Sequence, residues 1–235
     1  MPTVEIGLTL TFRTPPSVGA GGASGTLADK VITRNARGQF IIPASQLKGK
    51  LRHACEQLLR ARDAPLCRPP HPDRMCPQVE EDGGRPLPMI NEQPLCLLCQ
   101  VFGAPSRPSR LRFHDLVALR ADLPHETLRP MVSLNRHRRT AEEQRLFLVE
   151  TAPHLGSAAE GLEFGNSTAI TGDLDDRSHL HLLLAGFKLI FTWGGGSSRG
   201  LGWGEVTWQV RLGDESLGKI EVSKEEVEKL CPSSR

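Results

Sequence analysis

Apolar and polar residues alternate along two stretches near the ends of the chain. The apolar positions are Val4, Ile6, Leu8, Leu10 and Phe12 in the first stretch and Val206, Trp208, Val210 and Leu212 in the second. A period of two residues is typical of β-strands that bury one face. The two stretches therefore predict strands of an antiparallel sheet that is covered on one side.

Two internal stretches have the helical period instead. The apolar stripes are Leu47, Leu51, Ala54, Cys55, Leu58 and Leu59 within residues 44–62, and Leu180, Leu183, Leu184 and Phe187 within residues 174–190. Intervals of three and four residues predict amphipathic helices. Pro43 precedes the first stripe, which suits a helix start. Terminal strands with two helices between them predict an α+β fold.

The middle of the chain lacks these periods. Residues 64–110 are rich in proline and cysteine, and residues 126–165 are rich in arginine and other polar side chains. Clusters of this kind predict loops and insertions rather than regular core elements. We interpret both segments as insertions into a single domain that spans residues 1–235.

Composition restricts the function classes. The chain has 235 residues, of which 38% are hydrophobic, and a formal net charge of +2, so a core is expected but a strongly basic nucleic-acid binder is not. Any nucleic-acid site must therefore depend on local clusters of charge. The first residues do not have the pattern of a secretory signal, and no apolar run is long enough to span a membrane. We expect a cytoplasmic protein.

Four of the six cysteines lie in the proline-rich segment. Cys67 and Cys76 precede Cys96 and Cys99, and the last two form a CxxC pair. A CxxC pair supplies two thiolates from one turn, and a second pair completes a tetrahedral zinc site. We predict a structural zinc ion held by these four cysteines, with His71 as an alternative ligand. Buried thiols, or a redox pair formed by Cys96 and Cys99, are the other interpretations.

Basic residues recur in short clusters. These are Lys48, Lys50 and Arg52 on the first predicted helix, Arg107, Arg110 and Arg112 after the cysteines, and Arg136, His137, Arg138 and Arg139 in the second polar segment. Each cluster alone is typical of a solvated surface, but together they indicate a track for phosphates. Aromatic residues make up only 5% of the chain, so base-stacking surfaces are expected to be scarce.

The stretch WGGGSSRGLGWG, residues 193–204, surrounds one arginine with glycines. Glycine accepts positive φ and lets backbone N–H groups approach a phosphate closely. The stretch has neither the P-loop pattern nor the dinucleotide-binding pattern. A hairpin without a ligand is the alternative, but an arginine between serines offers a fork of donors to a polyanion. The predicted phosphate-binding residues are Gly195, Gly196, Ser198 and Arg199.

Three motifs together resemble the CRISPR RAMP superfamily. IPASQLKGKLRHACE (residues 42–56) is similar to its IPGSSLKGKLR helix start, LCLLCQVFG (95–103) to its CxxCxxFG element, and GGGSSRGLGWGEV (194–206) to its carboxyl-terminal glycine-rich loop. Ala44 and Gln46 depart from the glycine and second serine of the first motif. Within the superfamily the likeness is greatest to the repeated backbone subunit of type III effector complexes, which cleaves target RNA.

The resemblance implies an RNA-recognition-like (ferredoxin-like) palm, a zinc-binding insertion at residues 64–110 and a β-hairpin thumb at residues 126–165. The implied partners are guide CRISPR RNA, complementary target RNA and other RAMP subunits, including copies or paralogues of the chain. The implied RNA contacts are Ser45, Lys48, Lys50, Arg52, Arg136, Arg138, Arg139, Thr140 and the glycine loop with Arg199.

Asp29 occupies the place of the family's catalytic aspartate, in the loop before the helix motif. It would cut target RNA by attack of a ribose 2′-OH, with a divalent cation such as Mg²⁺ or Mn²⁺. Two alternatives remain open. The chain could be a non-catalytic RAMP subunit that binds guide RNA or caps the filament. It could also be a guide-RNA-processing endonuclease with a histidine base, for which His53, His114 and His137 are available.

Overall fold

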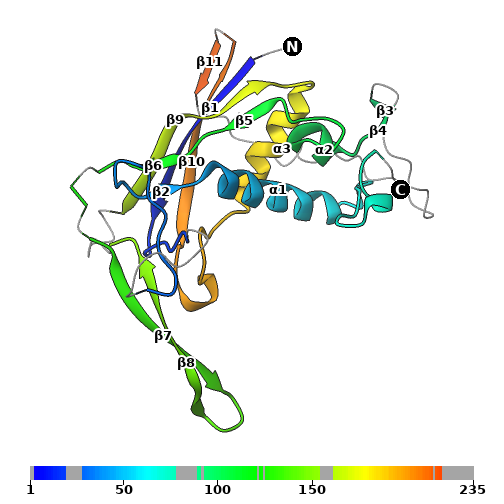
Figure 1. Ribbon diagram of the computed structural model, residues 1–235. Coiled ribbons are helices and arrows are strands. Elements are labelled where there is room, and N and C mark those ends of the chain that lie inside the picture. Colours follow the sequence, from blue (N-terminus) through cyan, green and yellow to red (C-terminus); the bar gives the residue numbers. More distant parts are fainter. Residues whose placement is uncertain are drawn as a thin grey trace.

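The computed structural model describes residues 3–19, 28–77, 89–90, 93–120, 122–123, 125–153, 161–213 and 215–218. A seven-stranded antiparallel sheet lies at its centre (Figure 1). In spatial order its strands are β11 (Glu215–Gly218), β10 (Gly204–Leu212), β1 (Thr3–Phe12), β9 (Leu162–Asp173), β6 (Leu116–Ala118) and β2 (Ile41–Ile42), and β5 (Leu111–Phe113) also pairs with β9. The predictions of an antiparallel sheet and of an α+β fold are confirmed.

β1 lies between β10 and β9 and is the central strand. Its five alternating apolar side chains are all 3% exposed or less, whereas the residues between them are partly exposed. The two predicted terminal strands therefore pair directly with each other, with Val4 opposite Leu212 and Phe12 opposite Gly204.

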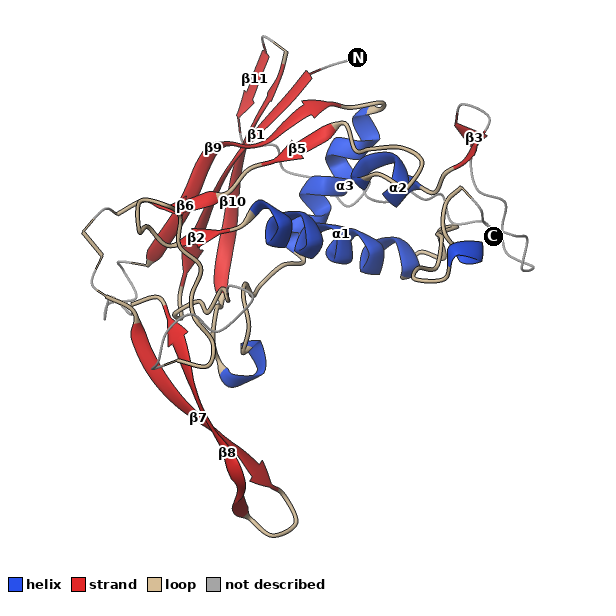
Figure 2. Cartoon of the chain, in the orientation of Figure 1, coloured by secondary structure: helices blue, strands red, loops and turns tan. Residues whose placement is uncertain are grey.

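Two of the helices, α1 (Ala44–Arg60) and α3 (Arg177–Lys188), lie on the same side of the sheet (Figure 2). Both were predicted, and α3 begins three residues later than expected. Asp176 fixes that start, because its Oδ1 accepts a hydrogen bond from the N–H of Ser178 at 2.6 Å. The helices approach closely at Gly186, where a Cβ atom would lie 2.6 Å from the Cys55 Sγ. Cys55 is fully buried in this contact.

The cysteine-bearing segment is built from short elements. They are a 3₁₀ helix (Pro72–Arg74), β3 (Met89–Ile90), β4 (Gln93–Pro94) and α2 (Leu97–Phe102). α2 buries Leu98, Val101 and Phe102 in the same core as α1 and the sheet. This end of the segment is therefore part of the main core and does not stand apart from it.

β7 (Thr127–Asn135) and β8 (Thr140–Thr151) form a separate two-stranded hairpin that projects away from the central sheet (Figure 1). In the sequence, the hairpin is inserted between β6 and β9. The last four residues of the expected insertion, 162–165, are already part of β9. Among the described helices, none has the length and apolar content needed to cross a membrane.

Candidate functional site

A cleft of about 450 Å³ lies at the base of the hairpin. Its walls come from the segment after β1, the segment before β2, both hairpin strands and the glycine loop. The described lining residues are Ser17, Gly19, Asp29, Lys30, Met131, Val149, Gly195, Gly196, Arg199 and Leu201. The structure therefore brings together four of the residues predicted from the sequence, namely Asp29, Gly195, Gly196 and Arg199.

Asp29 is held against the hairpin by its backbone and by its side chain. Its N–H donates to the carbonyl oxygen of Leu148 at 3.0 Å, and its Oδ2 accepts from the N–H of Leu148 at 2.8 Å. Lys30 continues the contact, since its carbonyl oxygen accepts from the N–H of Glu150 at 2.9 Å. The segment thus runs beside β8 like a short added strand. Asp29 is nevertheless exposed to solvent.

Two cations share one aromatic ring beside Asp29. The Lys30 Nζ lies 5.6 Å and the Arg199 guanidinium carbon 5.4 Å from the ring centroid of Phe147 on β8. Both distances are within the range of cation–π attraction. An Arg199 Nη also lies 3.4 Å from the Met131 sulfur. The only carboxylate among the described lining residues is thus accompanied by two positive charges, and the cleft attracts anions.

The glycine loop is a packed structure rather than a free linker. Gly195 donates its N–H to the Ser17 carbonyl at 2.8 Å. Gly202 has a φ of +70°, and a Cβ there would lie 1.9 Å from the Trp193 carbonyl oxygen. Because no other residue fits such a contact, the loop needs glycine for its own folding. The turn of Ser197–Arg199 follows Gly196, which is also left-handed, and places the Arg199 side chain at the cleft.

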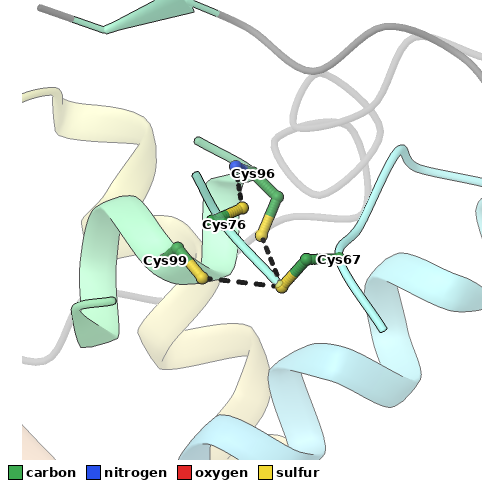
Figure 3. A group of neighbouring side chains, drawn as sticks. All are labelled: Cys67, Cys76, Cys96 and Cys99. Atoms are coloured by element: carbon green, nitrogen blue, oxygen red, sulfur yellow. Dashed lines mark hydrogen bonds between the residues drawn. The ribbon is translucent and has the colours of Figure 1, made fainter. Parts of the chain in front are cut away.

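The four cysteines of the central segment form a buried cluster beside α1 and α2 (Figure 3). All four Sγ atoms lie within 4.8 Å of one another. The Cys67 Sγ lies 3.6 Å from that of Cys99 and 3.7 Å from that of Cys96. Tetrahedral zinc with Zn–S bonds of about 2.3 Å needs sulfur separations of about 3.8 Å, so the cluster fits this ion. His71 is exposed and does not belong to the group.

The basic residues of α1 are half-buried, not fully exposed on the helix surface as expected. Lys50 donates from Nζ to the carbonyl oxygen of Thr192 at 2.9 Å, at the start of the glycine loop. Burial lowers the pKa of both Lys48 and Lys50. Lys48 and Arg52 line a second cavity, of about 510 Å³, beside the cysteines. Ser45 is exposed on the first turn of the helix.

Ser198 lines a further cavity beside the glycine loop, and the other predicted RNA contacts lie at the tip of the hairpin. Arg136, Arg138, Arg139 and Thr140 are exposed there, and none of them lines the cleft at its base. Asn135 organises the turn, since its side-chain oxygen accepts from the N–H groups of residues 137 and 138 at 3.0 Å. The three histidines considered as possible bases are also absent from the described lining of the cleft.

Sequence reasoning missed Lys30, which lines the cleft, and Phe147, whose ring contacts Lys30 and Arg199. The positive charge of Lys30 next to Asp29 was a visible signal. Nothing in the sequence, however, connects Asp29 or Lys30 to Phe147. That connection depends on contacts across more than a hundred residues, such as the pairing of Asp29 with Leu148.

Comparison with known proteins identifies one matching family. The profile of the RAMP superfamily matches residues 9–205, which contain both the cleft and the cysteine cluster. No curated protein matches the chain.

Proposed function

The chain belongs to the RAMP superfamily, and we propose that it is a guide-RNA-binding backbone subunit of a type III CRISPR effector complex that cuts complementary target RNA. Membership implies a role in binding CRISPR RNA, and some members are ribonucleases. The observation that carries the proposal is the cleft at the base of the hairpin. It combines a carboxylate, two cations and a glycine loop, which are suited to bind and to cut a phosphodiester chain.

The connectivity supports this assignment. β1, α1, β5 with β6, β9, α3 and β10 follow one another as strand, helix, strand, strand, helix, strand. The sheet order β10, β1, β9, β6 agrees with the order expected for the RNA-recognition-like palm that we propose. We interpret the hairpin of β7 and β8 as the thumb. It would lie along the guide–target duplex and expose one target nucleotide to the cleft.

In the proposed reaction the target RNA itself supplies the nucleophile. The 2′-oxygen of a ribose forms a bond to the adjacent phosphorus, the P–O5′ bond breaks, and the products are a 2′,3′-cyclic phosphate and a 5′-hydroxyl. The proton of the 2′-OH is transferred to Asp29, and the departing O5′ takes a proton from water. Lys30 and Arg199 stabilise the charge on the phosphate oxygens.

The protein would supply few ligand atoms to a divalent cation in the cleft. Asp29 is the single carboxylate among the described lining residues, and its Oδ2 already accepts the Leu148 N–H. Asp29 could offer one further oxygen, so RNA phosphates and water would have to complete the ligand set. When bound, such an ion would supply charge stabilisation at the reacting phosphate.

Substitution of Asp29 by alanine in the assembled effector complex tests the proposal. We expect cutting of target RNA to be lost while guide binding is retained. The matched control is Glu143→Ala, which removes an exposed carboxylate from the hairpin outside the described cleft lining. Unchanged cleavage in the Asp29→Ala complex would exclude the catalytic role.

One observation favours the non-catalytic alternative. Because Asp29 accepts a hydrogen bond from β8, it could act only by fixing the hairpin. Asp29→Asn separates the two roles, since asparagine keeps an acceptor oxygen but loses the negative charge. Full activity in the asparagine variant together with loss in the alanine variant would favour the anchoring role.

A further inference from the structure

Two large aromatic side chains remain exposed beside the glycine loop. Phe191 precedes the loop and is 59% exposed, and Trp203 ends it and is 46% exposed. A bridge between Thr192 and Trp203 brings the two ends of the loop together. Single exposed apolar residues are common, but two large rings at one site call for a partner with an apolar surface.

Both rings line one cavity of about 450 Å³, separate from the cleft at the base of the hairpin. Its apolar part includes Ala54, Leu189 and Ile190 as well as the two rings. The polar groups around it are Lys50, His53, Gln57, Thr192, Ser197 and Ser198. Flat rings with hydrogen-bonding groups at the rim are the means by which proteins hold unpaired nucleobases.

The backbone on either side of the cavity is fixed before any ligand binds. The N–H of Trp203 donates to the Thr14 Oγ1 at 2.9 Å, and its indole Nε1 lies 3.4 Å from the Ser197 carbonyl oxygen. The carbonyl oxygen of Phe191 accepts from the N–H of Gly204 at 3.1 Å. A fixed surface loses little conformational entropy on binding, which favours a small rigid ligand.

The charge at the rim indicates what the ligand is attached to. Lys50 is held at this rim because its Nζ donates to the Thr192 carbonyl oxygen at 2.9 Å, whereas Arg199 of the same loop lines the hairpin cleft. An aromatic group linked to a phosphate chain satisfies both the rings and Lys50. An apolar protein segment would satisfy the rings but would leave Lys50 without a counter-charge.

We infer that Phe191 and Trp203 form a binding site for an unpaired RNA base, next to the loop that binds the RNA backbone. This inference rests on the proposed RNA-binding function and extends it. The low aromatic content of the sequence suggested few stacking surfaces. The site of Phe191 and Trp203 adds a contact to an RNA base, which binding of the RNA backbone alone does not provide.

The test compares RNA binding by the purified full-length chain and its variants. The probes are a short single-stranded oligoribonucleotide and an abasic oligomer of the same length. The variants are Trp203→Ala, Trp203→Phe and Phe191→Ala, and Leu119→Ala is the control because Leu119 is also exposed, at 56%, but lies elsewhere. Trp203→Phe keeps an aromatic ring and is a second variant at the same position, in case Trp203→Ala loses binding only because it misfolds.

We expect Trp203→Ala and Phe191→Ala each to weaken binding of the oligoribonucleotide by about fivefold or more, and to leave binding of the abasic oligomer unchanged. Trp203→Phe and Leu119→Ala should bind like the wild type. The base should also quench part of the tryptophan fluorescence of the wild type, because Trp203 is accessible at the site, whereas Trp193 is fully buried and Trp208 is stacked on Phe187. Trp203→Phe should lose that quenching.

The outcomes separate this inference from the proposed function. Binding of RNA by the wild type with equal affinity in both alanine variants overturns the base site and leaves the RNA-binding proposal standing. Equal weakening for the abasic oligomer also overturns it, since the rings would then act on the backbone. Failure of the wild type to bind either oligomer overturns the RNA-binding proposal and this inference with it.

Discussion

Asp29 and Leu148 form a reciprocal pair of hydrogen bonds across 119 positions of the sequence. The carboxylate accepts from the Leu148 N–H at 2.8 Å, while the Asp29 N–H donates to the Leu148 carbonyl oxygen at 3.0 Å. The candidate catalytic residue is therefore attached to the base of the hairpin. Any displacement of the hairpin by RNA would move the carboxylate as well.

This pairing predicts a structural effect of Asp29→Ala apart from any loss of cleavage. The substitution leaves the Leu148 N–H without its side-chain acceptor, which we expect to cost about 1 kcal/mol locally. Amide hydrogen exchange at Leu148 should accelerate several-fold in the full-length chain. Asp29→Asn, which keeps an acceptor oxygen, should restore most of the protection. Equal exchange in all three proteins would show that the side-chain bond does not stabilise the hairpin.

Arg199 should contribute to RNA affinity mainly through charge. Arg199→Gln removes the guanidinium near the Phe147 ring, and we expect the dependence of log K on log salt to become shallower by about one. Arg199→Lys should keep most of the slope. The control is Arg211→Gln, an exposed position on β10 outside the described lining of the cleft. A slope identical to the wild type in Arg199→Gln would contradict a phosphate contact.

Periodicity predicted β1, β10, α1 and α3, because each of them buries one face, but it did not predict α2 or the strands of the hairpin. The alternation from Val4 to Phe12 marks β1, and the stripe that includes Leu47 and Leu51 marks α1. The start of α3 was less accurate, because a hydrophobic stripe does not show that Asp176 caps the helix. Cysteine spacing indicated a metal cluster because two cysteine pairs can supply the four thiolates of a tetrahedral site, and the structure brings the four sulfur atoms together.

The cleft could be predicted only in part. The glycine composition indicated a special loop, but Gly202 is required by its contact with Trp193, which is a matter of folding and not of ligand binding. The half-burial of Lys50 follows from its bond to Thr192, and the exposure of Phe191 and Trp203 follows from where the loop closes. Such facts depend on tertiary contacts that no local pattern contains.

His179 should make stability depend on pH. It is buried in α3, and burial lowers the pKa of its imidazole, opposed by Asp175 and Asp176 and assisted by Arg107. The folded protein therefore favours the neutral ring. This contribution is fully present above the unfolded pKa of about 6.5 and is lost as pH falls through the lower pKa of the folded state.

We expect the melting temperature to fall by a few degrees between neutral pH and about pH 5, since each unit of pKa difference corresponds to about 1.4 kcal/mol. His179→Gln should be less stable at neutral pH but should show a weaker dependence in this range. Thermal unfolding followed by circular dichroism at several pH values measures both. An identical pH dependence in the variant would assign the effect to other groups.

Arg52 should stabilise the metal form of the cysteine cluster. One Nη of Arg52 lies 3.9 Å from the Cys99 Sγ, and the other donates to the Gly103 carbonyl oxygen at 3.4 Å. Four thiolates around Zn²⁺ carry a net charge of about −2, so a cation held at this distance offsets part of it. Arg52→Gln should therefore release zinc about tenfold faster to a competing chelator, whereas Cys96→Ser should fail to retain it.

Lys48→Gln is the matched control, because Lys48 lies one helical turn before Arg52 and lines the same cavity. It removes one positive charge from α1 without removing the guanidinium at the Cys99 sulfur, so zinc release should stay close to the wild-type rate. Equal acceleration in both variants would mean that general charge on the helix, and not the contact with Cys99, controls the metal. Wild-type release in Arg52→Gln, with zinc still bound, would show that the cluster holds its ion without help from this residue.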